Sequence, residues 1–432
     1  MAMIVKNNMQ ALNTLNTLNS NTNALTSSLK KVSSGMKINS AQDDASGYAI
    51  SERMRVQIRS LDQAKANTNS GNSLLKVAEG AVSSTVDILK TLKEKVINAA
   101  NDTNTDEDRA TIQKELNQSI DQINDNASVT FNGKFLVDGT HNKKTTKTTT
   151  TLTNQSLKAG TASGTAMTAL CNRNGDSLNI QETDYVTVSY TVQGKTTTFT
   201  TKVGTQTLGN IIGFASPVVS TTVKDTSHIG IDGSGASVYT ASGKEAVTIT
   251  AKTAGIDGQV AGLSISITDK DGNARKAANS ALDAFNETIR AVNESADNSI
   301  HMQIGVKANQ TINVGMTDMR ATALGLQGDN GDCLNVGTRE KANAAITVLD
   351  NAIQKALDQQ TSIGAAESRL EYTAANLTTA SENVTNAEST IRDADMAKEM
   401  TEYTKNNVLM QAAQSMLAQA NQNSSNVLSL LQ

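Results

Sequence analysis

The side chains that most often carry metal binding or nucleophilic catalysis are few and scattered in this sequence. Its 432 residues include three histidines and two cysteines. His141, His228 and His301 lie far apart and lack the spacing that would direct two imidazoles to one metal ion. Cys171 and Cys333 have no histidine nearby, so we interpret them as two unpaired thiols, with a disulfide between them as the alternative. The sequence therefore predicts no catalytic, cofactor or metal site, and no enzyme.

Two acidic clusters invite an interpretation as carboxylate sites, but both stand where the backbone needs hydrogen-bond acceptors. Asp43 and Asp44 directly precede an expected helix, where they would cap exposed N–H groups and favour the positive helix end. The run from Asp269 to Asn273 resembles the beginning of a calcium loop, yet its glycine comes too early and the closing glutamate is missing. We predict a helix cap at the first cluster and a turn at the second.

The composition argues against several classes of protein. The net charge is −4, the chain has no Trp and one Pro, and only 3% of its residues are aromatic. No basic face interleaved with aromatic residues points to nucleic acid, and no apolar run is long enough to insert into a membrane. Residues 1–12 lack the apolar stretch of a Sec signal peptide. Burial must come from many aliphatic contacts, which suits long, thin helical packing.

Both ends of the chain carry an apolar stripe at helical spacing. The N-terminal stripe consists of Val5, Met9, Leu12, Leu15, Leu18, Leu25, Leu29 and Val32. The C-terminal stripe, in which steps of seven residues dominate, consists of Met396, Met400, Tyr403, Met410, Leu417, Leu428 and Leu431. The residues opposite the N-terminal stripe are Asn, Thr and Ser, which are mediocre helix formers, so this helix needs a partner. Either the two termini pair as a coiled coil, or each stripe docks on the core of its own domain.

Longer helices are predicted inside these ends. Apolar periodicity favours a helix over 45–98, and Thr105 with Asp108 resembles a capping box that opens a second helix. Residues 129–135, with Asn-Gly at their centre, predict a β-hairpin. The returning half is expected to contain, in order, a helix over 277–297, a strand region over 304–314 and a long helix over 339–393.

The middle of the chain, residues 141–276, has a different pattern. Thr145–Thr153 is almost entirely Thr and Lys and is interpreted as a low-complexity linker. Apolar residues alternate before and after Gly194, and again in 247–251 and 263–267, which predicts hairpin strands with one buried face. The predicted fold class is mainly α with a β-rich insert. The N- and C-terminal segments form a long coiled-coil-like antiparallel helical bundle, which carries small β-hairpins and an outer β domain.

Several segments at both ends resemble those of bacterial flagellins. They are VSSGMKINSAQDDASG at 32–47, FNGKFLVDG at 131–139, QIG at 303–305, INVGMTDM at 312–319, IRDADMA at 391–397 and LAQANQ at 417–422. The resemblance covers about residues 1–140 and 277–432 and is specific, because independent segments occur in the same order. The middle resembles the variable region of the family only loosely.

The resemblance implies a structural subunit that polymerises into the extracellular filament of the bacterial flagellum, used for swimming. In flagellins, the terminal helices are disordered in the monomer, pass unfolded through the flagellar type III export apparatus, and pair afterwards as the inner tube. The implied division is 1–42 and 395–432 for the polymerisation helices, 43–140 and 277–394 for the bundle, and 141–276 for the surface-exposed variable domain. Implied partners are further copies of the chain, the export apparatus and its chaperone, and the filament cap and hook-junction proteins.

Flagellins are also ligands of the innate immune receptor TLR5, through the start of the bundle. The matching positions, and therefore the candidate receptor contacts, are Leu89, Lys90, Thr91, Glu94, Lys95, Asn98 and Glu115. Strong agonists usually carry Arg where this chain has Thr91 and an apolar residue where it has Lys95, whereas Glu115 keeps the acidic contact. Because Thr lacks the donors of a guanidinium fork, we expect a weak agonist. The same stretch would also lie in lateral contacts of the filament.

Two alternatives compete with a filament subunit. A hook–filament junction protein shares the terminal helices but usually lacks this dense set of flagellin segments. An adhesin or glycan-binding module formed by the middle domain is the second alternative. It would use aromatic residues that are few in this region: Tyr185, Tyr190, Phe199 and Tyr239.

Overall fold

The structure is a computed structural model that describes residues 8–215, 218–220 and 224–430. It contains two compact units. Unit 1 consists of Met1–Thr68, Gln303–Gln310 and Tyr372–Gln432, and unit 2 consists of Asn69–Met302 and Thr311–Glu371. The two longest helices, α2 (Ala45–Ala99) and α6 (Arg339–Arg392), contribute to both units. Both were predicted to within one residue at each end.

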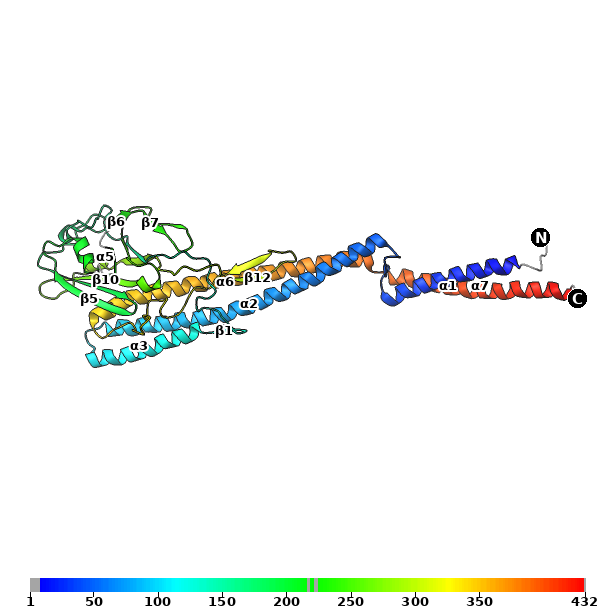
Figure 1. Cartoon of the computed structure of the whole chain (residues 1–432), viewed down its shortest axis with the longest axis horizontal. Coiled ribbons are helices and arrows are strands. Elements are labelled where there is room, and N and C mark those ends of the chain that lie inside the picture. The colour runs from blue at the N-terminus through cyan, green and yellow to red at the C-terminus, as the bar shows by residue number, and fades with distance from the viewer. Residues whose placement is uncertain (1–7, 216–217, 221–223, 431–432) are drawn as a thin grey trace. The chain divides into compact units, whose positions relative to one another are not determined.

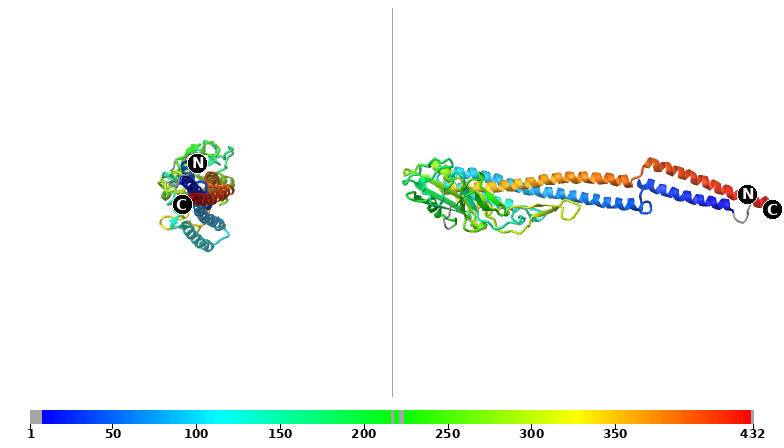
Figure 2. Two further views of the ribbon diagram at one scale, coloured as in Figure 1. Left: turned by 90° about the vertical axis from the view of Figure 1, so that its right-hand side faces the viewer. Right: turned by 90° about the horizontal axis from the view of Figure 1, so that it is seen from above.

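Unit 1 is built from helices. The first, α1 (Met9–Ser34), begins after Asn8, whose side chain accepts a hydrogen bond from the backbone N–H of Ala11, and ends at Gly35 with φ of 70°. The last, α7 (Met396–Leu430), lies beside α1 and runs in the opposite direction (Figures 1 and 2). The long terminal helices therefore pack on each other, which decides between the two alternatives left by their apolar stripes.

The helical part of unit 2 adds α3 (Asp106–Ala127) to α2 and α6. The predicted capping box is confirmed: Thr105 Oγ1 accepts from the N–H of Asp108, and the Asp108 carboxylate accepts from the N–H of Thr105. The Asn-Gly hairpin is confirmed as well, with β1 (Thr130–Phe131) and β2 (Lys134–Phe135) joined by two residues of positive φ. The side chains of α2 that face the core, such as Leu75 and Leu92, are fully buried.

The β-rich part of unit 2 contains two antiparallel sheets and two small ribbons. One sheet has the order β10-β4-β5, and the other has the order β11-β3-β9-β6. The first sheet comprises β4 (Tyr185–Val192), β5 (Lys195–Lys202) and β10 (Val260–Thr268). The second comprises β3 (Thr151–Asn154), β6 (Lys224–Thr226), β9 (Ala246–Thr250) and β11 (Phe285–Ile289). The ribbons pair β7 (His228–Ile231) with β8 (Ser237–Tyr239) and β12 (Ile300–Gln303) with β13 (Thr311–Val314).

The core of this β-rich part follows the alternation expected of half-buried strands. Val186, Val188 and Tyr190 of β4 face inward, and so do Leu263 and Ile265 of β10. Short helices close the same core, namely α4 (Leu208–Gly213), α5 (Lys276–Leu282) and η1 (Met167–Ala169). A further short helix, η2 (Ile256–Gly258), precedes β10. Of the aromatic residues weighed for glycan binding, Tyr190 is buried here and Tyr185, Phe199 and Tyr239 are exposed. The adhesin function stays a prediction.

The helix predicted over 277–297 is wrong. The chain forms α5 only as far as Leu282 and then the strand β11. Phe285 and Ile289 are buried, four residues apart, and were therefore mistaken for one helix face. The intervening inward position of the strand is Glu287, whose side chain is 4% exposed. A buried carboxylate on the apolar face hid the alternation. Because β11 pairs with β3, the β-rich region includes residues beyond 276.

Two further expectations about the middle of the chain are wrong. Thr145–Thr153 is no linker, because residues 151–154 form the inner strand β3, with Thr151 and Thr153 almost completely buried. Thr is β-branched and therefore suits a β-strand, so a run of Thr does not by itself indicate a linker. The stretches 247–251 and 263–267 do not pair as a hairpin, because β9 and β10 belong to different sheets.

Both acidic clusters serve the backbone as predicted, with one difference in detail. Asp44 accepts hydrogen bonds from the first turn of α2, including the N–H of Gly47 at 3.0 Å. Asp43 does not cap that helix but closes the preceding turn, where it accepts from the N–H groups of residues 39 and 40. Asp269 accepts from the N–H groups of residues 271 and 273. These backbone hydrogen bonds lower the pKa of Asp44 and of Asp269.

Candidate assembly interface

The pair of α1 and α7 is held together by polar contacts along its length. Asn8 Nδ2 donates to the carbonyl of Ala420 at 3.2 Å, and Asn406 Nδ2 donates to Ser28 Oγ at 3.0 Å. The order of these contacts shows that the helices are antiparallel. Each contact links a side-chain amide to the opposite helix. These contacts therefore set the register of the two helices but bury little apolar surface.

The side chains buried between these two helices are small. Among the described residues of α1 and α7, only Ser28, Ala413 and Ala420 are below a tenth exposed. Small residues let two helices approach closely but bury little apolar area. The pair therefore gains much less from burial than unit 2 does.

The predicted apolar stripes are on these helices, and half of their twelve described side chains are exposed while the other half are partly buried. Exposed fractions of 41–55% are found for Met9, Leu12, Leu15, Leu29, Met396 and Met400. Partial burial is found for Leu18, Leu25, Val32, Tyr403, Met410 and Leu417. Val5 and Leu431 lie outside the described residues, and so does the side chain of Leu428. Leu409 and Met416, which repeat the seven-residue step of the C-terminal stripe, are 42% and 62% exposed. The prediction missed Val408, which is 60% exposed.

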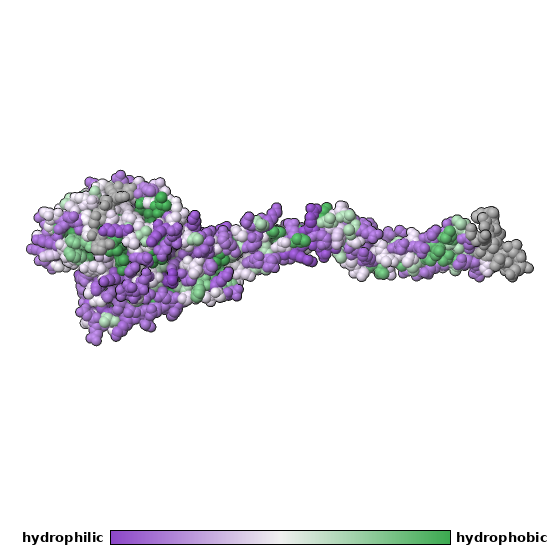
Figure 3. Space-filling view, in the orientation of Figure 1, coloured by the Kyte–Doolittle hydropathy of each residue, from purple (hydrophilic) through white to green (hydrophobic). Residues whose placement is uncertain are grey.

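These exposed side chains give the α1–α7 pair an apolar character that a soluble helix pair would normally hide. Figure 3 shows hydrophobic residues at the surface of this pair, interrupted by polar ones. Single exposed apolar residues need no explanation, but a series of Leu, Met and Val along both helices marks an interaction surface. The arrangement can associate with another apolar helix.

A buried arginine fixes the point at which the two terminal helices join the rest of unit 1. The N–H of Lys37 donates to the carbonyl of Arg392 at 2.8 Å. Arg392 is 5% exposed, its Nη1 donates to Glu52 at 2.6 Å, and its guanidinium lies 5.4 Å from the centre of the Tyr48 ring. The hydrogen bond from Arg392 is the main reason that the pKa of Glu52 is lowered. Arg392 lies in one of the flagellin-like segments, but its contacts with Glu52 and Tyr48 were not predicted from the sequence.

The candidate receptor contacts differ in how far their side chains are exposed. Leu89 is completely buried in the core of unit 2, so its side chain is not available to a receptor. The side chains of Lys90, Thr91, Glu94 and Asn98 are exposed. Lys95 Nζ lies 3.0 Å from the Glu115 carboxylate, so these two candidates neutralise each other.

Within the described ranges, no three His, Cys, Asp or Glu side chains lie together as potential metal ligands. Cys171 and Cys333 are both free thiols. Among the residues that the structure describes, no helix has the length and apolar character needed to cross a membrane. Paired terminal helices with open apolar faces define a class of self-associating structural proteins.

Comparison with known proteins gives the family. The model of the bacterial flagellin N-terminal helical region matches residues 5–142, and that of the C-terminal helical region matches residues 346–431. A flagellin of Clostridium tyrobutyricum is 36% identical, over 97% of this chain and 99% of its own. A flagellin of Bacillus subtilis is 34% identical, over 99% of this chain and 100% of its own. A flagellar hook associated protein of Legionella pneumophila aligns with 79% of this chain and 98% of its own, with a TM-score of 0.35 and 14% identity.

The chain belongs to the bacterial flagellins. It is a structural subunit of the flagellar filament, an extracellular structure, and not an enzyme. The hook–filament junction alternative is less well supported, because the full-length relatives are flagellins.

Proposed function

We propose that the chain polymerises through the exposed apolar side chains of α1 and α7, which pack against the same helices of neighbouring copies. The single observation that carries this proposal is that the helix pair leaves side chains such as Leu12, Met400 and Met416 at least two-fifths exposed. A head-to-tail contact between copies generates an open helical array when the rotation from one copy to the next does not close a ring.

Within such a filament, residues 1–42 and 395–432 would form the inner layer. Residues 43–140 and about 290–394 would form the next layer, and the β-rich part, from near residue 141 to Ile289, would face outward. The burial pattern supports this boundary in place of one at residue 276, because the core of the β-rich part includes Ala278, Leu282 and Phe285. Nothing in that core depends on a neighbouring copy.

Electron microscopy of seeded assembly tests the proposal. The full chain is compared with a fragment that lacks residues 1–40 and 395–432. We expect long filaments from the full chain only. A full chain that binds seeds without elongating them would favour the junction-protein alternative instead.

A matched pair of variants assigns the effect to the apolar face. Leu15→Glu places a charge on an exposed apolar position of α1, and Asn16→Glu places the same charge on the next exposed position. Because a charge is costly to bury in an apolar contact, we expect Leu15→Glu to prevent elongation and Asn16→Glu to retain it. Equal assembly of the two variants would contradict the proposed contact.

We further propose that the chain leaves the cell unfolded through the flagellar type III apparatus, with a chaperone, cap and hook-junction proteins as partners. The weak burial between α1 and α7 supports this, because helices that gain little from pairing stay unfolded at low cost. Secretion that persists in cells without the flagellar export apparatus would refute it.

The receptor proposal rests on exposed Thr91. We expect weak activation of TLR5, because Thr91 offers one hydroxyl, already donated to the carbonyl of Asp87 at 3.0 Å, in place of a guanidinium. Thr91→Arg should strengthen activation in a receptor reporter assay. Thr379→Arg is the matched control, because Thr379 is an exposed threonine of α6 outside the candidate contacts whose hydroxyl likewise donates to the carbonyl four residues earlier. Equal activation by wild type and Thr91→Arg would refute the proposal.

A further inference from the structure

Two short stretches of unit 1, here named the connecting segments, link the terminal helices to the long helices. Residues 35–44 lead from α1 to α2, and residues 393–395 lead from α6 to α7. Two backbone hydrogen bonds join these segments: the N–H of Lys37 donates to the carbonyl of Arg392 at 2.8 Å, and that of Ala394 donates to the carbonyl of Gly35 at 2.9 Å. Side chains then hold the joined segments against α2.

The side chain of Arg392 makes polar contacts with both a connecting segment and α2. This side chain is 6% exposed. Its Nε donates to the sulfur of Met36 in the first connecting segment at 3.2 Å. Its Nη1 donates to Glu52 at 2.6 Å and to Ser51 Oγ at 3.4 Å, and its guanidinium lies over the ring of Tyr48. One side chain at the end of α6 therefore links a connecting segment to the first turns of α2.

An apolar contact also holds the first connecting segment against α2. Ile38 is 5% exposed, and a Cβ on Gly47 would lie only 2.8 Å from its Cδ1. Ile38 therefore packs directly on the first turn of α2, where glycine leaves the room that it needs. Apolar burial has no preferred direction, whereas a planar guanidinium donates through a rigid fork. Arg392 is thus the contact suited to fix an angle.

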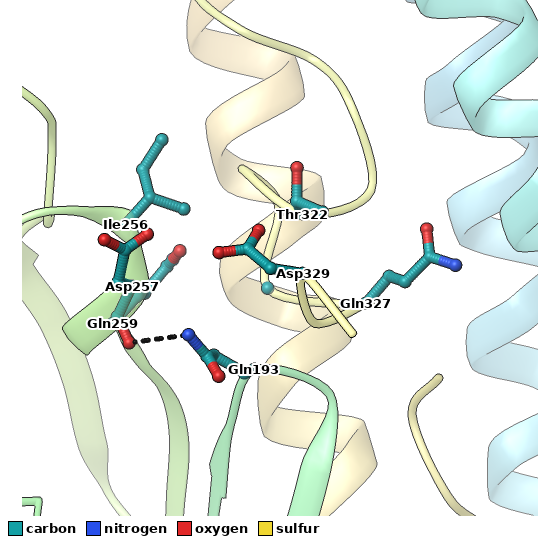
Figure 4. Close-up of a pocket in the computed structure, with 8 residues that line it drawn as sticks. Gln193, Ile256, Asp257, Gln259, Thr322, Gln327 and Asp329 are labelled. Carbon is teal, nitrogen blue, oxygen red and sulfur yellow. Dashed lines mark hydrogen bonds between the residues drawn. The ribbon is translucent and has the colours of Figure 1, made fainter. Parts of the chain in front are cut away.

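A buried charge is not required to join two segments of this chain. In unit 2, a neutral hydrogen bond joins two loops: the Gln193 amide donates to the backbone carbonyl of Asp257 at 3.1 Å, beside a small cavity (Figure 4). Taking a guanidinium out of water is costly, and an apolar side chain of similar volume is often equally stable in its place. The partner of Arg392 is itself only half-buried, because the side chain of Glu52 is 42% exposed. Selection of one geometry accounts for such a pair better than stability does.

We propose that Arg392 is a positioning residue for polymerisation, which fixes the orientation of the α1–α7 pair relative to the parts of α2 and α6 in unit 1. This inference rests on the polymerisation through α1 and α7 proposed above and names the residue that orients them. In a head-to-tail array, each copy repeats the rotation of the copy before it. A helix pair that turns about the connecting segments presents its exposed apolar side chains at many angles, and few of these continue the array.

Seeded elongation of the full-length chain tests this role. Arg392→Met keeps a long side chain without the guanidinium, and Arg392→Lys keeps the charge without the fork. Arg55→Met is the matched control, because the Arg55 side chain lies 3.6 Å from the same Glu52 carboxylate, is 43% exposed, and has Glu388 of α6 as its other partner. On wild-type seeds, we expect Arg392→Met to elongate at least roughly tenfold more slowly than wild type. Arg392→Lys should lie between the two, and Arg55→Met should equal wild type.

A distance measurement separates positioning from loss of folding. Nitroxide labels are attached at two exposed positions, Ser27→Cys in α1 and Gln57→Cys in α2, in a chain whose native Cys171 and Cys333 are replaced by serine. Pulsed EPR is recorded on filaments in which labelled chains are diluted with unlabelled chains of the same variant. We expect one narrow distance distribution when Arg392 is present and a broad distribution in Arg392→Met, with unchanged helical content by circular dichroism.

The outcomes distinguish this role from the polymerisation on which it rests. Wild type that does not elongate would refute the polymerisation and this role together. Wild type and Arg392→Met that elongate equally would overturn the role of Arg392 alone. Slow elongation with an unchanged distance distribution would also overturn it, because orientation would not be what Arg392 controls. If Arg392→Met does not fold, the same measurements on Arg392→Lys decide, and values equal to those of wild type would overturn the role.

Discussion

The terminal helix pair and the β-rich part of unit 2 use similar aliphatic residues in opposite ways. In the β-rich part, side chains such as Leu263, Ile265 and Phe285 are at most 1% exposed. In the pair of α1 and α7, residues of the same kind remain half exposed, and the buried positions are Ala and Ser. The β-rich part completes its core within a single chain. The α1–α7 pair leaves apolar side chains exposed, and neighbouring copies can bury them.

Because of this difference, the stability of the two regions should depend on different solution conditions. The stability of unit 2 should depend on its own sequence and on pH, and hardly on protein concentration. The order of the α1–α7 pair should depend on concentration, because it gains burial only when copies associate. The following predictions test whether this separation holds.

The largest effect is expected from truncating a buried aromatic residue. Phe285→Ala removes a ring that is 1% exposed and should lower the free energy of unfolding of unit 2 by about 3–5 kcal/mol. Leu12→Ala, at a position 49% exposed, should change that value by less than about 0.5 kcal/mol. It should instead raise the critical concentration for assembly roughly tenfold. Urea unfolding of the monomer and sedimentation of filaments measure the two quantities.

The comparison would break down if Leu12→Ala destabilised unit 2 as much as Phe285→Ala does. It would also break down if Phe285→Ala blocked assembly of chains that are still folded. Circular dichroism before each assembly reaction distinguishes folded from unfolded chains.

A pH effect of somewhat smaller size is expected from the buried carboxylate of β11. Burial raises the pKa of Glu287 from 4.5 to about 7, against the opposing charges of Arg290 and Lys355. Its folded-state pKa is above its unfolded value, so its stabilising contribution is complete below about pH 4.5 and is lost as pH rises through about 7. Unit 2 should therefore lose about 3 kcal/mol of unfolding free energy from this group between pH 5 and pH 8.

Glu287→Gln should flatten the dependence of unfolding free energy on pH between 5 and 8, measured by urea denaturation at each pH. Lys355→Met is the informative control. Lys355 is fully buried, with its Nζ donating to the carbonyl of Ala323 at 2.7 Å, and burial lowers its own pKa. Without its positive charge, the pKa of Glu287 should rise, and the loss of stability should move to higher pH. An unchanged slope in Glu287→Gln would show that other groups govern this window.

Much of the helical architecture could be predicted from sequence because its signals are local. The capping box at Thr105, the Asn-Gly hairpin and the long periodic runs of α2 and α6 each depend on neighbouring residues. Strand β11 was missed because Glu287 stands where the pattern requires an apolar residue. Strand β3 was missed because Thr suits buried and exposed strands alike, so its Thr residues did not indicate that the strand is buried. Both errors come from tertiary packing that overrides local pattern.

The candidate interface was predicted only in part, for a different reason. Apolar periodicity identifies one face of α1, but it does not say whether that face is covered by α7 or by another copy. The structure places Leu12 and Leu15 in the open and Ala413 and Ala420 in the contact.

The smallest effect compares the caps of two helices, one in each region. Thr105→Ala removes the cap of α3 and should lower the unfolding free energy of unit 2 by about 1 kcal/mol. Asn8→Ala removes the cap of α1 together with its hydrogen bond to the carbonyl of Ala420. Because α1 gains little from burial within one chain, Asn8→Ala should leave unit 2 unchanged and increase amide exchange only near Ala11. Hydrogen exchange of assembled chains, in which α1 is ordered, measures both caps at once. If Asn8→Ala instead increased amide exchange throughout unit 2, the two regions would unfold as one cooperative unit, and the terminal pair would be part of the folded core.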